Sequence, residues 1–522
     1  MKRILLLLTC VLTVFVSCSD YIPYLESQDS SFEAIPKQNN IACISEINGD
    51  GTGKPVTLTV SFVEDENKSY NYQWYSCSSI SKANPEKIEG ATDSSFTTGI
   101  IEEIGKPYYY YCEIQESNGA FTKTRETKAF SVCCTGLPTL YISTEDNRGI
   151  VNKSDWIPST FSFISEDQNL ELSASVKGRG NASWNYFPKR SYTIKLDKKN
   201  SIGDLPKSKR WVIVSNYNDK TLLRNWFASY MDNTVFGRDG DWDPSYIHVD
   251  CILNGEYIGS YTLTEQIRID DNRINIPDIT EVADYKDGGF ILEANFRLDE
   301  AYNFISSIGI PFSLKDPDME DTEIEIAAEI FEYIKSKVNN AESILKSNNF
   351  EEISKTVDLD SFVDWYIVNE IAKTFDGRFR TSVYMYYDPS DGLFHMGPDW
   401  DYDDSWGGSD YEDRLKTEDF YLNESGWYQY LFNNDEFIEM VRNRWNDKYT
   451  ETLESISALQ SKADEIEASA NQNFIKWELL GTSVFTSAPG YRKRKTYQSE
   501  VAFMKEWLED RIIWLNDAIN AL

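Results

Sequence analysis

Residues 177–184 read Lys-Gly-Arg-Gly-Asn-Ala-Ser-Trp, and residues 189–196 read Lys-Arg-Ser-Tyr-Thr-Ile-Lys-Leu. Period-two alternation predicts one strand over 171–177 and a second over 190–196. Glycines let the backbone approach a ligand closely, and free N–H groups beside Arg and Lys can hold phosphate oxygens. The two runs therefore predict a β-hairpin whose tip is a candidate anion site, with a purely structural Gly-x-Gly hairpin as the alternative.

A second informative run is Gly-Pro-Asp-Trp-Asp-Tyr-Asp-Asp at residues 397–404, and it follows Asp376-Gly377-Arg378 in the chain. Asp401 and Asp403 flank an aromatic residue after a short predicted strand, and such oxygen ligands suit hard cations. Carboxylates this close repel one another unless a cation neutralises them. The run therefore predicts binding of Mg²⁺ or Mn²⁺, with Ca²⁺ as an alternative ion and a solvated acidic loop as the structural alternative.

The chain from residue 136 to 522 mixes α and β patterns. Strands are predicted at 139–144, 171–177, 190–196, 211–215, 247–253, 256–263, 289–293, 382–387 and 393–396. Helices are predicted at 219–235, 321–346, 358–373, 435–470 and 496–520. A strand-rich first half and a helix-rich second half predict an α+β fold with two lobes.

Residues 41–135 show an all-β pattern, with several short segments of period-two alternation. Trp74 in one predicted strand and a Tyr-x-Cys ending at Cys112 in a later one resemble bacterial immunoglobulin-like domains. The strand that holds Val60 has no cysteine to pair with Cys112, so the usual bridge between the sheets is absent. We therefore predict an immunoglobulin-like β-sandwich over 41–135.

The first seventeen residues combine a charged start, Lys2-Arg3, with an apolar run from Ile4 to Val16. The run is too short to span a bilayer of roughly 30 Å, which is typical of a secretory signal. It ends at Phe-Val-Ser-Cys, where Cys18 resembles the acylated cysteine of bacterial lipoproteins. We predict a signal peptide over 1–17, a lipid anchor on Cys18, a flexible tether over 18–40, and a location at the bacterial cell envelope. Ordinary cleavage with a free Cys18 thiol is the alternative.

The formal net charge of −34 disfavours nucleic acid as a partner, because affinity there comes from cations that neutralise phosphates. The chain has only two histidines, His248 and His395, which nearly excludes a histidine triad or a multi-histidine zinc site. Any chemistry would therefore rest on carboxylates. Six of the eight cysteines follow Cys18, and an exported protein permits disulfides, so one or two bridges are predicted.

Four blocks together resemble the CotH kinase family, named for spore coat protein H. They are Arg179 to Trp184, the run 189–196, Val249 to Tyr261 with Glu265, and Trp400 to Asp403. The resemblance covers roughly residues 137–410. It implies an atypical secreted protein kinase that binds ATP and a divalent metal and phosphorylates serine or threonine of extracytoplasmic proteins. The common kinase signatures His-Arg-Asp and Asp-Phe-Gly are absent.

The resemblance also implies a role for each matching position. The loop over the phosphates would comprise Arg179, Gly180, Asn181 and Trp184, and the lysine paired with the phosphates would be Lys189 or Lys195. Asp376 would activate the acceptor hydroxyl, Asp401 with Asp403 nearby would bind the metal, and Glu265 would contact the nucleotide where the lobes join. Asp399 adds a carboxylate that bears on the choice of metal ligands. No histidine is required, because phosphoryl transfer depends on positioning and charge neutralisation.

Two other classes of function stay open at this stage. One is a non-catalytic surface protein of the same fold, a pseudokinase whose acidic loop binds Ca²⁺ and whose aromatic residues bind glycan or protein. The other is a glycoside hydrolase with paired carboxylates. For the kinase, the acidic chain predicts a basic extracytoplasmic protein as the acceptor.

Overall fold

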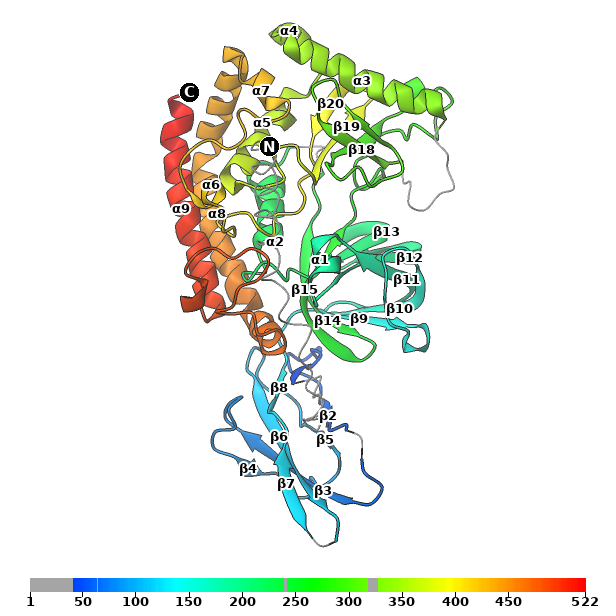
Figure 1. Cartoon of the computed structure of the whole chain (residues 1–522), viewed down its shortest axis with the longest axis vertical. Coiled ribbons are helices and arrows are strands. Elements are labelled where there is room, and N and C mark those ends of the chain that lie inside the picture. The colour runs from blue at the N-terminus through cyan, green and yellow to red at the C-terminus, as the bar shows by residue number, and fades with distance from the viewer. Residues whose placement is uncertain (1–40, 63, 120, 239–241, 318–326) are drawn as a thin grey trace, which may run out of the picture.

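The structure is a computed structural model that describes residues 41–62, 64–119, 121–238, 242–317 and 327–522. The predicted signal peptide, Cys18 and the tether lie outside these residues. No helix in the described ranges combines the length and the apolar character that a membrane span needs. Figure 1 shows a unit of strands at one end, a barrel in the middle, and two long helices along one side.

The N-terminal unit consists of strands only, so its all-β character agrees with the alternation in its sequence. Its strands are β1 Ala42–Ile44, β2 Thr57–Thr59, β3 Ser69–Cys77, β4 Glu86–Lys87, β5 Ser95–Thr97, β6 Tyr108–Ser117, β7 Thr122–Glu126 and β8 Phe130–Cys133. One sheet has the order β1-β8-β6-β3-β4 with β7 on β6, and β2 pairs with β5. Trp74 and Cys112 face each other across β3 and β6 in the buried core. Its immunoglobulin-like identity stays a prediction.

The six described cysteines form no disulfide, so the prediction of one or two bridges is wrong for them. The residue paired with Cys112 across the two strands is Trp74, which has no thiol with which to form a disulfide. Burial raises the pKa of the Cys112 thiol to about 12, so it stays protonated and unreactive at neutral pH.

Seven strands close into a barrel, a closure that the sequence patterns did not predict. They are β9 Thr139–Thr144, β10 Ile157–Ile164, β11 Asn169–Arg179, β12 Ser191–Ile202, β13 Leu205–Val214, β14 Tyr246–Leu253 and β15 Glu256–Glu265. The order is β10-β11-β12-β13-β15-β14-β9, and a parallel pairing of β9 with β14 completes the ring. Tyr192, Ile194 and Leu196 fill the interior, as their alternation indicates.

The rest of the chain surrounds a five-stranded sheet with helices, which confirms the mixed α and β composition. The sheet has the order β17-β18-β16-β19-β20. Its strands are β16 Phe290–Ala294, β17 Asn303–Ile305, β18 Pro311–Asp316, β19 Val383–Asp388 and β20 Leu393–Met396. The main helices are α3 Ala328–Lys346, α5 Leu359–Ala372, α8 Asp435–Lys476 and α9 Tyr497–Asn520. The shorter ones are α1 Ala182–Asn185, α2 Arg224–Tyr230, α4 Phe350–Ile353, α6 Glu412–Leu415 and α7 Tyr428–Leu431.

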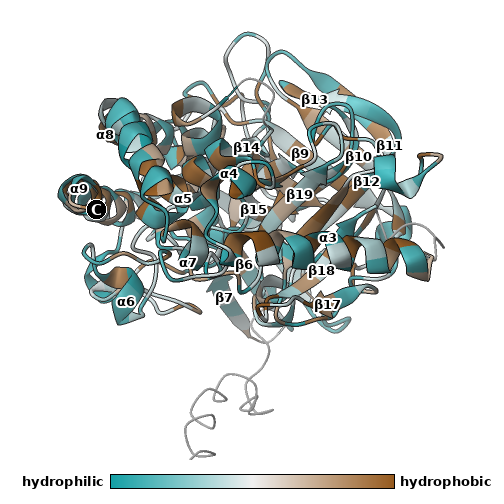
Figure 2. Ribbon diagram, turned by 90° about the horizontal axis from the view of Figure 1, so that it is seen from above, coloured by the Kyte–Doolittle hydropathy of each residue, from teal (hydrophilic) through white to brown (hydrophobic). Residues whose placement is uncertain are grey.

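Helix α5 is the centre of this region, since every residue from Ser361 to Ala372 is buried. Helix α3 instead shows one apolar stripe, with Ile334 and Val338 buried as their spacing predicts. The alternating apolar and polar patches along α3 are visible in Figure 2. Because α5 is fixed on all sides, the loop that follows it starts from a rigid base.

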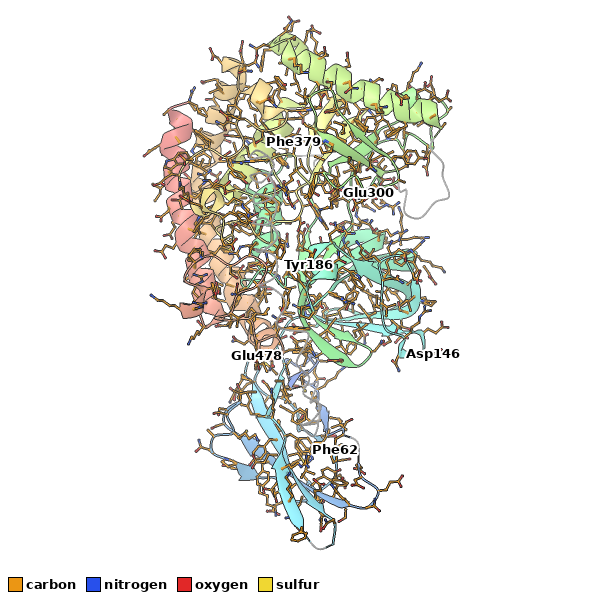
Figure 3. The ribbon with its side chains drawn as sticks, viewed as in Figure 1. Phe62, Asp146, Tyr186, Glu300, Phe379 and Glu478 are labelled. Carbon is orange, nitrogen blue, oxygen red and sulfur yellow. The ribbon has the colours of Figure 1, made fainter. Side chains whose placement is uncertain are left out.

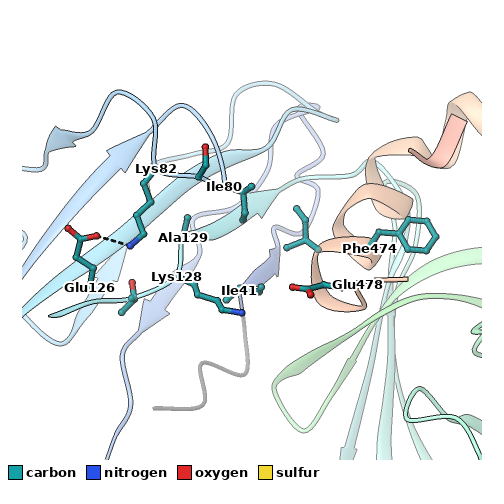
Figure 4. Close-up of a pocket in the computed structure, with 11 residues that line it drawn as sticks. Ile41, Ile80, Lys82, Glu126, Lys128, Ala129, Phe474 and Glu478 are labelled. Carbon is teal, nitrogen blue, oxygen red and sulfur yellow. Dashed lines mark hydrogen bonds and ion pairs between the residues drawn. The ribbon is translucent and has the colours of Figure 1, made fainter. Parts of the chain in front are cut away.

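A buried carboxylate ties the N-terminal unit to the rest of the molecule. Asp250 on β14 accepts hydrogen bonds from the hydroxyls of Thr135 (2.5 Å), Tyr257 (3.0 Å) and Ser469 (2.7 Å). Beside this contact, a cavity of about 470 Å³ separates the strands of the N-terminal unit from the end of α8 (Figure 4). Of the three hydroxyls only that of Thr135 belongs to the N-terminal unit, and a second polar contact joins the Gln472 amide on α8 to the Ser131 hydroxyl at 2.9 Å.

Asp250 is expected to make the stability of the fold depend on pH. Burial raises its pKa from 3.8 to about 6, so the native state keeps this proton after the unfolded state has lost it. The stabilisation is complete below pH 3.8 and is lost as the pH rises through 6. Relative to Asp250→Asn, the wild type should lose up to about 3 kcal/mol of unfolding free energy across this window.

Urea titrations of both proteins at several pH values measure this difference. Asp510→Asn, at an exposed position on α9, is the control and should run parallel to the wild type. Parallel curves for the Asp250 variant would contradict the prediction.

Candidate active site

Four carboxylates gather where two loops meet beside α5. Asp376 follows the C-terminus of α5, and Asp401, Asp403 and Asp404 lie in the loop after β20. That loop is held in place by the N–H of Trp406, which donates to the carbonyl of Ala372 at the end of α5 (2.9 Å). The sequence-predicted Asp376, Asp401 and Asp403 therefore do come together.

The backbone around these carboxylates adopts unusual conformations. Asp401 has a φ of 71°, and Phe379 and Ser382 in the facing loop have φ values of 55° and 58°. Non-glycine residues in the left-handed region cost free energy, and they gather at sites where the geometry serves a function. The Ser382 hydroxyl donates to Asp401 Oδ2 at 3.3 Å, which joins the two loops.

The carboxylates repel one another, as their spacing in the sequence suggested. Withdrawal from water raises the pKa of Asp376, and the charges of Asp401 and Asp404 raise it further. The pKa of Asp403 is raised by burial and then by Asp401 and Asp404. Burial and Asp404 likewise raise the pKa of Asp401. A cation placed among these groups would relieve this repulsion.

The donor set fits Mg²⁺ or Mn²⁺ better than a cage for Ca²⁺. In the described parts of the chain, three ligand atoms lie within 4.8 Å of one another only at Asp388, Asp391 and His395. The four carboxylates of the site are not packed that tightly. Ca²⁺ needs six to eight protein or water oxygens, whereas Mg²⁺ is commonly held by one or two carboxylates together with substrate phosphates. The site therefore suits a metal that arrives with a phosphorylated ligand.

Arg179 places one end of the run 177–184 at this site. Strand β11 ends at Arg179, and Gly180 follows with a φ of 93°, a conformation that favours glycine. The Arg179 guanidinium lies over the Trp400 ring at 5.3 Å, next to Asp401 in the chain. Its positive charge also lowers the pKa of Asp401 against the effect of burial. The glycine loop of the barrel and the acidic loop thus meet, although they lie far apart in the sequence.

The other residues of the glycine loop mainly build the barrel. Trp184 is buried, and a Cβ at Gly178 would come within 2.3 Å of its ring, so the glycine is required for packing. Asn181 accepts a hydrogen bond from the Lys153 ammonium at 3.1 Å. The assignment of Trp184 to the phosphate loop is therefore corrected to a core residue, because its ring packs with the barrel interior.

The structure separates the two candidate lysines. Lys189 is buried between β15 and α8, where its ammonium donates to the carbonyl of Ser260 and to Asn473 Oδ1 (2.5 and 2.8 Å). These bonds engage two of the three donors of the Lys189 ammonium, and its assignment to the phosphates stays a prediction. Lys195 instead lies over the Trp156 ring at 5.7 Å, as Lys177 does at 4.8 Å. The alternation of β11 places Lys177 on the same strand face as Arg179.

Glu265 lies at the end of β15, where its carboxylate is held by protein groups. Arg273 Nε is 3.4 Å from Glu265 Oε1, and the N–H of Ser245 donates to Oε2 at 3.3 Å. Burial still raises the pKa of Glu265 above its usual range. The structure therefore gives Glu265 structural partners, and its contact with the nucleotide stays a prediction.

Sequence reasoning missed the role of Asp399 and two arginines near Asp376. Asp399 is buried, accepts from the Asn369 amide at 3.0 Å, and belongs to a separate internal network. Its N–H also donates to Asp243 Oδ1 at 2.7 Å, so Asp399 anchors the loop. Arg297 and Arg380 lower the pKa of Asp376. Arg380 could have been noticed, because it lies in the same short loop as Asp376.

Metal binding at this site is expected to strengthen as the pH rises. Without a cation, these carboxylates hold protons to higher pH than ordinary aspartates, since their pKa values are raised. A cation must displace those protons, so it should bind more weakly at low pH and release protons when it binds. Calorimetry with Mn²⁺ and ATP in two buffers of different ionisation enthalpy measures this release. Binding without proton release from the protein at mildly acidic pH would contradict the assignment of these ligands.

Residues 176–515 match the family model described as CotH kinase protein, which covers more than half of the chain. No curated protein matches the chain.

Proposed function

Because the chain belongs to the CotH kinase protein family, we propose that it transfers the γ-phosphoryl group of ATP to serine or threonine of extracytoplasmic proteins. The observation that carries this proposal is the contact of Arg179 with Trp400, which joins the glycine loop to the acidic loop. ATP would lie between the barrel and the acidic loop, with its phosphates near Arg179. The barrel and the helical region would be the two lobes of a kinase-like domain.

The cationic side of the proposed site comes from the barrel. Arg179 would contact the phosphates directly, and Lys195 with Lys177 would add positive charge from the same barrel wall. Gly180 and Asn181 would form the turn that lets the backbone approach the nucleotide. Positive groups fixed in place stabilise the charge that develops on the transferred phosphoryl group.

The acidic side would hold the metal and the acceptor. Asp401 and Asp403 would bind Mg²⁺ or Mn²⁺, which would neutralise charge on the phosphates. Asp376 would accept the proton of the serine or threonine hydroxyl. The hydroxyl oxygen would bond to the γ-phosphorus as the bond to ADP breaks and ADP leaves. A pKa raised from that of an ordinary aspartate makes Asp376 a better proton acceptor, provided that it is ionised when the cation is bound.

We also propose that the protein is exported and anchored through lipid on Cys18, with the N-terminal unit as an immunoglobulin-like spacer. The hydrogen bonds of Thr135 to Asp250 and of Gln472 to Ser131 support a fixed placement of that unit against the kinase-like domain. The anchor and this fixed joint would together limit which proteins reach the site.

One observation favours a non-catalytic alternative that binds nucleotide without transferring phosphate. Protein kinases carry an asparagine five residues after the catalytic aspartate, where it holds a second metal ion. Here that position is Thr381, whose hydroxyl accepts a hydrogen bond from Arg297 at 2.7 Å. Threonine offers a weaker metal ligand than asparagine, and Arg297 would bring a positive charge to this position.

The proposal is tested with the whole mature chain, γ-labelled ATP, and Mn²⁺ or Mg²⁺. Label on serine or threonine, located by mass spectrometry in the chain itself or in an added protein, would support the kinase. Metal-dependent ATP binding without transfer would favour the non-catalytic alternative. Absence of ATP binding would contradict both.

A further inference from the structure

A strip of three aromatic rings and one arginine lies beside Asp376. We define this acceptor strip by Phe296, Phe375, Arg380 and Tyr411. The Arg380 guanidinium lies 4.2 Å from the centre of the Phe375 ring and 4.8 Å from that of Phe296. Phe375 in turn stacks on Tyr411, with ring centres 6.1 Å apart and planes 16° apart.

The strip is open to solvent although it is rich in apolar surface. Phe296 is 48% exposed and Tyr411 is 56% exposed, and Arg380 is exposed as well. Exposed aromatic rings next to arginine are typical of surfaces that bind another protein. Since the strip begins at the residue before Asp376, a polypeptide bound there would place its hydroxyl near Asp376.

The backbone holds Arg380 in a fixed position. Its carbonyl accepts from the N–H of Phe296 at 2.8 Å, and its own N–H donates to the carbonyl of Asp376 at 3.1 Å. The preceding residue, Phe379, is buried in the core and is labelled in Figure 3. A guanidinium confined by two rings loses little freedom when it pairs with a ligand.

Arg380 has no carboxylate in direct contact among the described residues, although its charge lowers the pKa of the nearby Asp376. Its guanidinium contacts the two rings and makes no ion pair with a carboxylate of the described residues. Arg378, two residues earlier, differs in this respect. Its guanidinium lies 3.7 Å from the Tyr421 ring centre, donates to the Tyr421 carbonyl at 3.1 Å, and is 3.8 Å from Asp413. Arg378 is engaged, whereas Arg380 can still pair with an external anion.

We propose that the acceptor strip binds an acidic segment of the acceptor protein, and that Arg380 pairs with an Asp or Glu carboxylate close to the target serine or threonine. This inference rests on the proposed function and names its substrate class. It replaces the expectation of a basic acceptor, which followed from net charge alone. Local charge at the site decides recognition at close range, because exposed charges beyond about 10 Å are largely screened by salt.

The test uses three serine peptides of one length with the whole mature chain. The residues that flank the serine are Asp and Glu in the first peptide, Asn and Gln in the second, and Lys in the third. The wild type should prefer the acidic peptide over the neutral one by roughly 10- to 100-fold in kcat/KM. Arg380→Glu should lose this preference and favour the Lys peptide, and Arg380→Gln should lose it without reversal.

Arg378→Glu is the matched control and should keep the acidic preference, since that arginine is already paired. Circular dichroism of each variant establishes that it is folded. Preference of the wild type for the neutral or Lys peptide, or an acidic preference that survives in Arg380→Glu, would overturn the inference.

Binding of fluorescently labelled peptides, measured by anisotropy, separates this inference from the proposed function. Acidic peptide that binds in an Arg380-dependent manner without receiving phosphate would support the strip and count against the kinase. Phosphate transfer with no Arg380-dependent preference in transfer or binding would support the kinase and overturn the strip.

Discussion

Replacing Asp401 by Asn is expected to lower phosphoryl transfer by roughly 10³-fold or more, in line with the loss of other charged groups that act on transferred phosphate. The amide keeps the size of the side chain but removes a negative charge from the carboxylates of the site. Metal affinity should fall with it, because a neutral amide oxygen is a weaker ligand for a hard cation. The variant should fold normally, since Asp401 is an exposed residue and the amide has nearly the same size as the carboxylate.

Two further variants sharpen this result. Asp410→Asn alters an exposed aspartate of the same loop and should leave transfer within a few-fold of the wild type. Asp376→Asn should abolish transfer while ATP and metal still bind, because Asp376 acts on the acceptor hydroxyl. Full activity in Asp401→Asn, or an equal loss in Asp410→Asn, would remove Asp401 from the site.

Replacing Arg511 by Ala is expected to lower the free energy of unfolding by about 3–5 kcal/mol, the usual effect of leaving one member of a buried ion pair without its partner. Arg511 on α9 and Glu370 on α5 are both fully buried, and Arg511 Nη2 is 2.7 Å from Glu370 Oε1. The same guanidinium donates to the carbonyls of Thr417 and Asp419 at 2.8 and 2.9 Å. The Glu370 carboxylate also accepts from the N–H groups of Tyr421 and Leu422.

Urea unfolding of the purified variants measures this loss. Arg442→Ala, which removes a partly exposed i,i+3 pair with Glu439 on α8, should cost at most about 1 kcal/mol. Because α5 leads directly into the Asp376 loop, Arg511→Ala should also weaken transfer at temperatures where the native state persists. A loss no larger than that of Arg442→Ala would show that the pair does not hold α5 in place.

The sequence predicted elements well where the apolar pattern was long and regular. The strand at 139–144 and the strand at 393–396 have the predicted bounds, and α9 begins and ends within a residue of 496–520. The helix expected from 219 begins at Arg224, because Asp219 accepts from the N–H groups of Thr221 and Arg224 and so holds a turn before the helix. The strand β10 was missed even though Phe161 and Phe163 alternate with polar residues.

Long-range contacts could not be read from the sequence. Lys189 and Lys195 lie close together in the chain, and only the packing of Asn473 from α8 against Lys189 tells them apart. The closure of the barrel depends on the parallel pairing of β9 with β14, for which no local pattern exists. It was the resemblance to the CotH kinase family that brought Asp376, Asp401 and Arg179 into one hypothesis, and each of them lies in a short loop at the end of a predicted element.

The proposed function requires that the glycine loop and the acidic loop hold one nucleotide and its metal between them. The most direct measurement is calorimetric binding of ATP to the whole mature chain with and without Mn²⁺, for the wild type, Arg179→Ala and Asp401→Asn. We expect one ATP to bind per chain, and only when the metal is present. Each of the two substitutions should lower the affinity for ATP by at least about 10-fold. ATP binding that is absent, or that neither the metal nor the two substitutions affect, would contradict the proposed function.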